Sequence, residues 1–298
     1  MAASGRVGTV AGLWRFPVKS MGGERIDRAE LSERGMVGDR AFALVDVDTG
    51  KVASAKSVKL FPGLLRCRAE FVEPPEAGRD LPPVRITLAD GRTVMSDARD
   101  ANGALSAYFG RQVTLSRMAP EDYTIDQFHP DIENVDPAGY RNTFVEQKLG
   151  SAFFAEAGVP SPVPVGAFLD LFPVSVLSTS TVAQLNALQP QSRFDERRFR
   201  MNVIVDTTDA GFPENEWVGK SVALGDTVRL QIALPDPRCV MTTLERDELP
   251  SDAEVLRTLV RYNRLQVGAS GLYPCAGVYA VVQTAGPMRS GDSVVVAS

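Results

Sequence analysis

The sequence contains very few of the residues on which the common catalytic chemistries of proteins depend. Its 298 residues include one histidine, His129, and three cysteines, Cys67, Cys239 and Cys275. The chain therefore has too few histidines and cysteines to form most Ser-His-Asp triads, Cys-His pairs or histidine-ligated zinc sites. The three cysteines form neither a disulfide framework nor a CxxC metal motif. No apolar run is long enough to span a membrane, so we expect no membrane partner.

Charge and hydrophobicity narrow the class of protein further. The formal net charge of −5 disfavours nucleic acid as a partner, although it is compatible with a local basic site for a small anion. A hydrophobic content of 44% is typical of a globular chain with a substantial core, and a length of 298 residues predicts two domains. Residues 1–6 lack the apolar segment of a secretory signal, which predicts a cytoplasmic protein.

Short apolar segments separated by turn signals predict a chain that is mainly β with some helix (α+β). The first hundred residues indicate a compact, barrel-like all-β unit, with one helix over residues 101–109. Residues 118–141 are polar and turn-rich, and we expect them to bridge or cap the two domains. We therefore expect one domain over residues 1–118 and a second over residues 119–298, which includes a linker at 119–145.

The segment around Cys239 is the strongest candidate for a reactive site. An apolar strand runs into the turn Pro235-Asp236-Pro237, which should fix Arg238 and Cys239 at its exit. A cysteine beside a fixed guanidinium is favoured as a thiolate, which is a good nucleophile and a good ligand for soft metals. The alternative is that Cys239 is a small buried hydrophobe, as free cysteines commonly are.

A second candidate is an anion site near the N-terminus. Lys19 and Ser20 follow a predicted strand at a turn defined by Pro17, so an ammonium, a hydroxyl and backbone N–H groups could converge on an anion. Arg40 would add a bidentate phosphate donor. The alternative is a solvated hairpin end, in which Asp39 pairs with Arg40. The absence of a GxxxxGK[ST] motif excludes the ordinary nucleotide P-loop.

A third candidate is the basic segment at residues 197–202. Alternation along a strand would place Arg198, Arg200 and Asn202 on one face. Buried together, the two arginines would repel each other unless they met a polyanion. The alternative is a basic edge that faces solvent.

These three segments, in this order, resemble those of the two-domain MOSC proteins, the family that includes the amidoxime-reducing components. The matching stretches are residues 16–20 (Phe-Pro-Val-Lys-Ser), 35–40 (Gly-Met-Val-Gly-Asp-Arg), Asp170 with 177–178 (Leu-Ser), 199–202 (Phe-Arg-Met-Asn), 217–220 (Trp-Val-Gly-Lys) with 225–226 (Gly-Asp), 237–243 (Pro-Arg-Cys-Val-Met-Thr-Thr) and 291–292 (Gly-Asp). The resemblance covers nearly the whole chain, and the order of the motifs carries its specificity. Residues 244–250 depart from the family pattern.

The resemblance implies an N-terminal MOSC β-barrel domain, a β-rich MOSC domain and a bound molybdenum cofactor. The cofactor is a pyranopterin dithiolene with a terminal phosphate, and Cys239 would be its metal ligand and the catalytic residue. The other residues implied at the cofactor are Lys19, Ser20, Arg40 and Arg200 around the phosphate and pterin, Arg238 and Asn202 near the metal, and Asp170 and Ser178.

The reaction implied by the resemblance is the reduction of small N-hydroxylated compounds with release of water. The chain has no four-cysteine cluster motif, so electrons would come from a separate donor protein of the ferredoxin, flavin-reductase or cytochrome type. Two alternatives stay open: a sulfur- or cofactor-carrier protein that uses Cys239 without redox turnover, and a β-barrel binding module without a cofactor. Cys67 is expected to be a packing residue, and Cys275 to be inert, with a place in the lining of the site as the alternative. His129 is expected to be a solvated loop histidine, with a proton-relay role near the cleft as the alternative.

Overall fold

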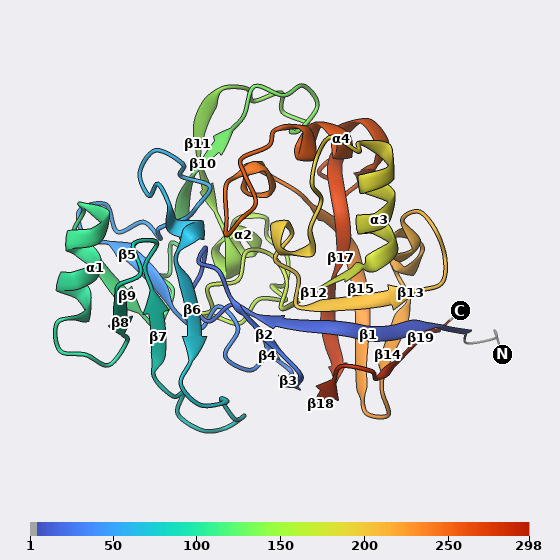
Figure 1. Cartoon of the computed structure of the whole chain (residues 1–298), viewed down its shortest axis with the longest axis horizontal. Helices are drawn as coiled ribbons and strands as arrows, with labels where there is room; N and C mark the ends of the chain where they lie inside the picture. Colours follow the sequence, from blue (N-terminus) through green and yellow to red (C-terminus); the bar gives the residue numbers. More distant parts are fainter. Residues whose placement is uncertain (1–4, 298) are drawn as a thin grey trace.

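The computed structural model of the chain describes residues 5–297. Residues 1–4, part of the segment from which a cytoplasmic location is predicted, lie outside this range. Within it, strands dominate, and four α-helices and four short 3-10 helices pack around them. This arrangement confirms the predicted mainly-β (α+β) class (Figure 1).

Seven strands form a closed barrel. In order around it they are β12 (Val174–Ser178), β13 (Val203–Thr207), β1 (Gly5–Arg15), β19 (Ser293–Val296), β14 (Ser221–Leu224), β15 (Val228–Pro237) and β17 (Leu272–Thr284). Strand β17 pairs back with β12, which closes the barrel. Gly277 lies at this junction with a φ of 79°, and a Cβ there would be 2.6 Å from the carbonyl oxygen of Val176. Glycine therefore permits the close approach of the two strands.

Valine, leucine and isoleucine side chains fill the barrel because alternate residues of each strand point inward. The N-terminal segment is part of this core, since β1 pairs with both β13 and β19. Strands β2 (Glu24–Ile26), β3 (Arg28–Ser32) and β4 (Gly35–Met36) follow, and β3 pairs with β18 (Gly286–Arg289) near the C-terminus. Strands from the first 32 residues thus share sheets with strands that lie after residue 200.

A second body with its own core lies beside the barrel, on the left in Figure 1. Its elements are β5 (Ala43–Asp46), η1 (Leu64–Arg66), β6 (Arg68–Phe71), β7 (Val84–Thr87), β8 (Thr93–Met95), α1 (Ala101–Phe109) and β9 (Val113–Ser116). Helix α1, predicted from its apolar spacing, ends at Gly110, whose φ of 65° gives the left-handed cap that glycine tolerates.

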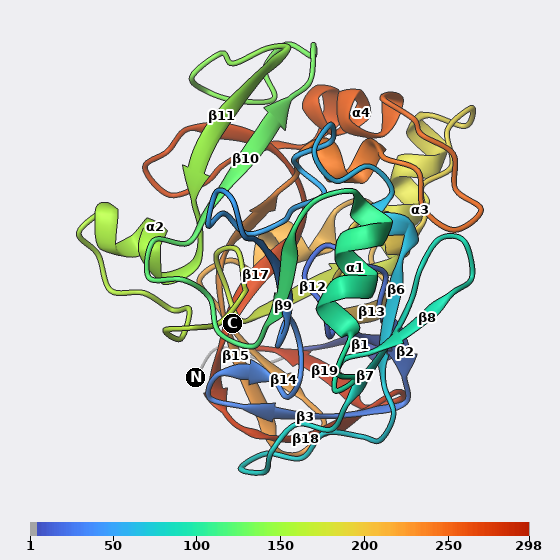
Figure 2. The same cartoon turned by 90° about the vertical axis from the view of Figure 1, so that its left-hand side faces the viewer.

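The polar segment after residue 118 contains a β-hairpin rather than irregular turns. Strand β10 (Thr124–His129) pairs antiparallel with β11 (Thr143–Lys148), and the hairpin projects at the top of Figure 2. Its polar composition hides the strand pattern in the sequence. Helix α2 (Gly150–Glu156) follows directly, so this segment supplies two strands and a helix that the sequence did not predict.

Two helices pack side by side against the barrel, α3 (Thr179–Leu188) and α4 (Glu254–Tyr262). The short helices η2 (Glu196–Arg198), η3 (Pro213–Trp217) and η4 (Val240–Thr243) complete this side, and β16 (Arg264–Gln266) pairs with β17. Among residues 5–297, no helix combines the length and apolar character needed to cross a membrane.

Candidate functional site

A cavity of about 500 Å³ is lined by residues from the second body, the β10–β11 hairpin and the barrel. This volume lies in the range of about 300–1,000 Å³ typical of small-molecule and cofactor sites. The residues predicted from the sequence that line the cavity are Lys19, Ser20, Arg40, Asp170, Arg200, Asn202, Arg238 and Cys239. Segments more than 200 positions apart along the chain therefore meet around one space.

Cys239 lies where β15 ends and η4 begins. It is half-buried, and its carbonyl oxygen accepts hydrogen bonds from the Thr242 backbone N–H (3.1 Å) and hydroxyl (3.0 Å). Cys67 and Cys275 are fully buried and do not line the cavity. Burial raises the pKa of the Cys67 thiol, and it raises that of Cys275 to about 12. Of the three thiols, Cys239 is the one placed to react with a ligand in the cavity.

Arg238 is fixed beside Cys239 on the cavity wall. Its guanidinium forms an ion pair with Asp236 and donates to the Phe199 carbonyl oxygen at 2.6 Å. The Arg238 Nε and Asp236 Oδ1 atoms are buried and have no hydrogen-bond partner within residues 5–297. Burial raises the pKa of Asp236 to about 6, although Arg238 acts in the opposite direction. These unpaired atoms leave polar capacity for a bound ligand.

Asp170 forms ion pairs with two lysines, Lys19 and Lys56. Lys56 Nζ lies 2.8 Å from Asp170 Oδ2, and Lys19 contacts the other carboxylate oxygen. Burial opposes ionisation of Asp170, but the two lysines outweigh it and hold the pKa below its usual range. Burial lowers the pKa of Lys19 to about 8, although Asp170 acts to raise it. Lys56 belongs to no motif, and sequence reasoning missed it.

Three of the predicted residues adopt a backbone conformation that is uncommon for their type. Ser20 has a φ of 63°, Arg40 of 46° and Arg200 of 57°. The other non-glycine residues with positive φ in the described chain are asparagines or an aspartate, which tolerate this region better. All three of the unusual residues line the cavity. Backbone strain of this kind, about 1–3 kcal/mol per residue, concentrates at functional sites.

Arg40 and Arg200 share an aromatic support. Their guanidinium carbons lie 4.6 Å and 4.3 Å from the centre of the Phe16 ring. Arg40 also pairs with Asp39 and donates to the Arg200 carbonyl oxygen at 2.9 Å, and Arg200 donates to the Met21 carbonyl oxygen. Burial lowers the pKa of Arg200, and the nearby Arg40 lowers it further.

The cavity wall therefore carries an excess of positive charge. Its cations with side chains at most 16% exposed are Lys19, Arg40, Lys56, Arg200 and Arg238. The carboxylates paired with them are Asp39, Asp170 and Asp236, and Asp136, with a side chain 13% exposed, is a further acidic residue of the wall, so the buried cations exceed the buried carboxylates by one. A buried cation without a counter-charge is strongly destabilising, so this wall fits an anionic ligand. An anionic phosphate with a soft metal matches the cations together with the Cys239 thiol.

Two predicted residues serve structural roles. Asn202 lines the cavity, but its Oδ1 accepts hydrogen bonds from the Ser175 backbone N–H and hydroxyl, both at 3.1 Å. Ser178 does not line the cavity. Its hydroxyl caps helix α3 by accepting from the Thr181 N–H at 3.0 Å and donates to the buried Glu214 carboxylate at 2.5 Å. Ser178 therefore caps helix α3 and does not line this cavity.

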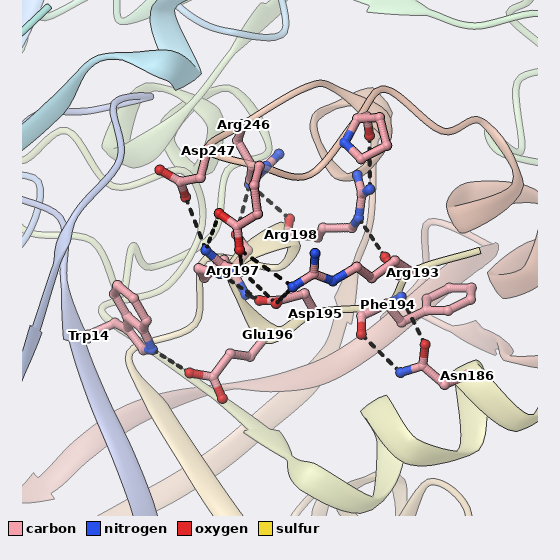
Figure 3. A network of polar contacts seen from close by, with 12 residues as sticks. Trp14, Asn186, Arg193, Phe194, Asp195, Glu196, Arg197, Arg198, Arg246 and Asp247 are labelled. Atoms are coloured by element: carbon pink, nitrogen blue, oxygen red, sulfur yellow. Dashed lines mark hydrogen bonds and ion pairs between the residues drawn. The ribbon is translucent and has the colours of Figure 1, made fainter. Parts of the chain in front are cut away.

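Arg198 and Arg246 belong to one polar network (Figure 3), and both donate to backbone carbonyl oxygens of residues 241–242, just after Cys239. Arg198 is fully buried and donates to the carbonyl oxygens of Thr242 (3.2 Å) and Pro250 (2.9 Å). Arg246 donates to the carbonyl oxygens of Met241 and Arg198. The prediction that Arg198 shares a strand face with Arg200 is wrong, because residues 196–198 form η2 and the strand begins at Val203.

His129 is not a solvated loop residue, contrary to the prediction. It ends strand β10, is 2% exposed and lines the cavity. Its Nδ1 lies 3.7 Å from Asp136 Oδ2, and its buried Nε2 has no hydrogen-bond partner in the described chain. His129 and Asp136 belong to no sequence motif, and their place at the cavity follows from the fold of the β10–β11 hairpin.

Comparison with known proteins identifies the class to which this barrel and cavity belong. Residues 7–108 match the MOSC N-terminal beta barrel domain, and residues 166–295 match the MOSC domain. The chain belongs to the MOSC proteins that carry the N-terminal barrel domain, which confirms the resemblance seen in the sequence.

Individual relatives are distant but match over nearly the full chain. Human mitochondrial amidoxime-reducing component 1 is 24% identical over 97% of this chain and 83% of the relative. Rat mitochondrial amidoxime reducing component 2 is 25% identical over the same shares. The solved structure of the YUAD protein from Bacillus subtilis aligns with 99% of this chain and 98% of its own, with 11% identity and a TM-score of 0.43.

Proposed function

We propose that this protein is a molybdenum-cofactor-dependent oxidoreductase that reduces N-hydroxylated compounds. Family membership and relatives named for amidoxime reduction support this function. The observation that carries it is the cavity wall, on which a half-buried thiol, Cys239, lies among buried cations that outnumber their carboxylate partners. That donor set suits a soft metal joined to an anionic organic group.

The residues that would hold the cofactor divide by chemistry. Cys239 would supply its sulfur to molybdenum, and Arg238 would stabilise that negatively charged ligand from the adjacent position. The residues that would bind the phosphate and pterin are Lys19, Ser20, Arg40, Lys56 and Arg200. Asp170 would keep Lys19 and Lys56 charged and oriented, which is a positioning role. Bound there, the cofactor would supply two-electron oxygen-atom transfer.

The chain itself would bind and orient a small N-hydroxylated substrate and keep bulk water from the metal. Aromatic side chains suited to a flat substrate line the cavity, namely Phe153, Phe154, Phe172, Tyr273 and Tyr279. Reduction of an N–OH group consumes two electrons and two protons and releases water. The electrons would come from a separate donor protein of the ferredoxin, flavin-reductase or cytochrome type.

The test is elemental analysis of purified protein for molybdenum, together with the fluorescence of its oxidised pterin. Near-stoichiometric metal and pterin, followed by turnover of benzamidoxime or a simple hydroxylamine, is the expected result. Persulfide on Cys239 without molybdenum would favour a sulfur-carrier protein instead. Neither metal nor pterin, from cells able to make the cofactor, would indicate a bare binding module.

A further inference from the structure

The one histidine of the chain occupies a place that the proposed function does not yet use. His129 lines the same cavity as Cys239, at the end of strand β10. A buried imidazole nitrogen without a partner is costly to keep, because polar atoms in an interior normally find a hydrogen bond. Its Nε2 is such an atom within residues 5–297, whereas Nδ1 faces Asp136.

We infer that His129 donates one of the two protons consumed when an N-hydroxylated substrate is reduced in this cavity. The inference rests on the proposed function. The Asp136 carboxylate, 3.7 Å from Nδ1, would stabilise the protonated ring by charge rather than by a hydrogen bond, and Nε2 has no protein partner within residues 5–297 and would be the nitrogen that donates. The Asp136 side chain is 13% exposed, which gives the pair a route to solvent protons.

The atoms and electrons of the step balance when one protein supplies the electrons and His129 supplies one of the two protons. A hydroxylamine reacts as R–NH–OH + 2e⁻ + 2H⁺ → R–NH₂ + H₂O, in which the N–O bond breaks and the oxygen leaves as water. The proposed electron-donor protein supplies both electrons. The imidazolium form of His129 supplies one proton from Nε2 and becomes neutral, the second proton is taken up from bulk solvent, and the imidazole then regains a proton from solvent past Asp136.

The groups that face His129 act on its charge in opposite directions. The neighbouring titratable and charged groups are Asp136, Lys56 and Tyr140, whose ring centre is 5.3 Å from the imidazole; Tyr273 on β17 lies near Asp136. Burial lowers the pKa of His129 below its ordinary value, Asp136 acts to raise it, and Lys56 lowers it. The protonated form is therefore lost as the pH rises through a pKa below about 6.5.

Asp236 is the competing acid, because it lines the cavity and burial raises its pKa to about 6. A pH limb in turnover therefore does not by itself identify the donor. Two matched substitutions distinguish His129 from Asp236 as the proton donor. His129→Gln removes the titrating group, and Asp136→Asn should lower the pKa of His129 by removing the carboxylate that raises it. Asp131→Asn is the control, since that exposed carboxylate pairs with Arg141.

The experiment measures turnover of benzamidoxime from pH 5 to 8 alongside an NMR titration of the imidazole. One histidine gives one set of imidazole signals, provided that no histidine tag remains. We expect His129→Gln to lower kcat by about 100-fold at low pH and to keep the KM and molybdenum content of the wild type. Its kcat should also no longer fall as the pH rises through the pKa of His129. In Asp136→Asn the kinetic limb and the NMR midpoint should move together to lower pH, and Asp131→Asn should move neither.

Equal kcat in His129→Gln and wild type, with the limb intact, would overturn the role of His129 and leave the reductase activity standing. Movement of the NMR midpoint without the kinetic limb in Asp136→Asn would overturn it as well, even if the glutamine variant failed to fold. Molybdenum-loaded wild type that reduces no N-hydroxylated compound would instead refute the proposed function, and the proton donor with it.

Discussion

Arg198 and Arg197 are neighbours in η2, and their environments predict very different contributions to stability. Arg198 is fully buried and donates to the carbonyl oxygens of Arg193 (2.9 Å), Thr242 (3.2 Å) and Pro250 (2.9 Å). Hydrogen bonds from a charged donor contribute about 1.5–3 kcal/mol each. The cost of burying the guanidinium offsets part of that sum. We therefore expect Arg198→Met to lower the free energy of unfolding by about 3 kcal/mol.

Arg197→Met is the matched control. Arg197 forms closer ion pairs, at 2.7 Å to Asp195 and 2.6 Å to Glu248, but the Glu248 side chain is 57% exposed. Solvent screening reduces the exposed Glu248 pair to about 0–1 kcal/mol. The Asp195 pair is partly buried, with side chains 23% and 19% exposed, so we expect this variant to lose some stability but less than Arg198→Met. Urea unfolding followed by tryptophan fluorescence compares the two, because Trp14 donates to Glu196 in the same helix at 2.8 Å. An equal or larger loss in Arg197→Met would refute the argument from burial.

Three further substitutions test individual positions of the site. Cys239→Ala should abolish turnover because the metal loses its protein thiolate, whereas Cys67→Ala should keep both molybdenum content and turnover; loss of both in the Cys67 variant would show that the wrong thiol was chosen. Arg40→Ala should lower the molybdenum and pterin retained after gel filtration because a phosphate contact is lost, and full occupancy would contradict that assignment. Ser178→Ala should cost about 1 kcal/mol as a lost helix cap while leaving cofactor content unchanged; loss of cofactor would instead return Ser178 to the site.

Much of the site could be predicted because short motifs hold its residues at the ends of apolar strands. Lys19, Ser20, Arg238 and Cys239 each follow such a strand at a proline-containing turn, and the fold brings these turns to one cavity. The family resemblance implied that these residues surround one cofactor, but no local sequence pattern shows their convergence. It depends on β1 joining strands from the C-terminal half, a pairing that no local pattern encodes.

The residues that were missed share one cause. Lys56 and His129 reach the cavity only because the β10–β11 hairpin packs beside residues 52–57, where Phe128 N–H donates to the Lys56 carbonyl oxygen at 2.9 Å. The hairpin is polar, so hydrophobic alternation did not reveal its strands. Arg198 was misplaced for a related reason. Period-two alternation presumes an extended strand, and the chain is helical at η2 and left-handed at Arg200.

Phe16 explains why a motif as short as Pro-x-Lys-Ser is specific here. Its ring supports both Arg40 and Arg200, its N–H donates to Asp39 Oδ1 at 2.8 Å, and its carbonyl oxygen accepts the Arg40 N–H at 2.7 Å. These contacts hold Arg40 in its strained conformation before any ligand arrives, so ligand binding does not have to meet that cost. The aromatic residue before the proline thus preorganises the two arginines that sequence reasoning assigned to separate motifs.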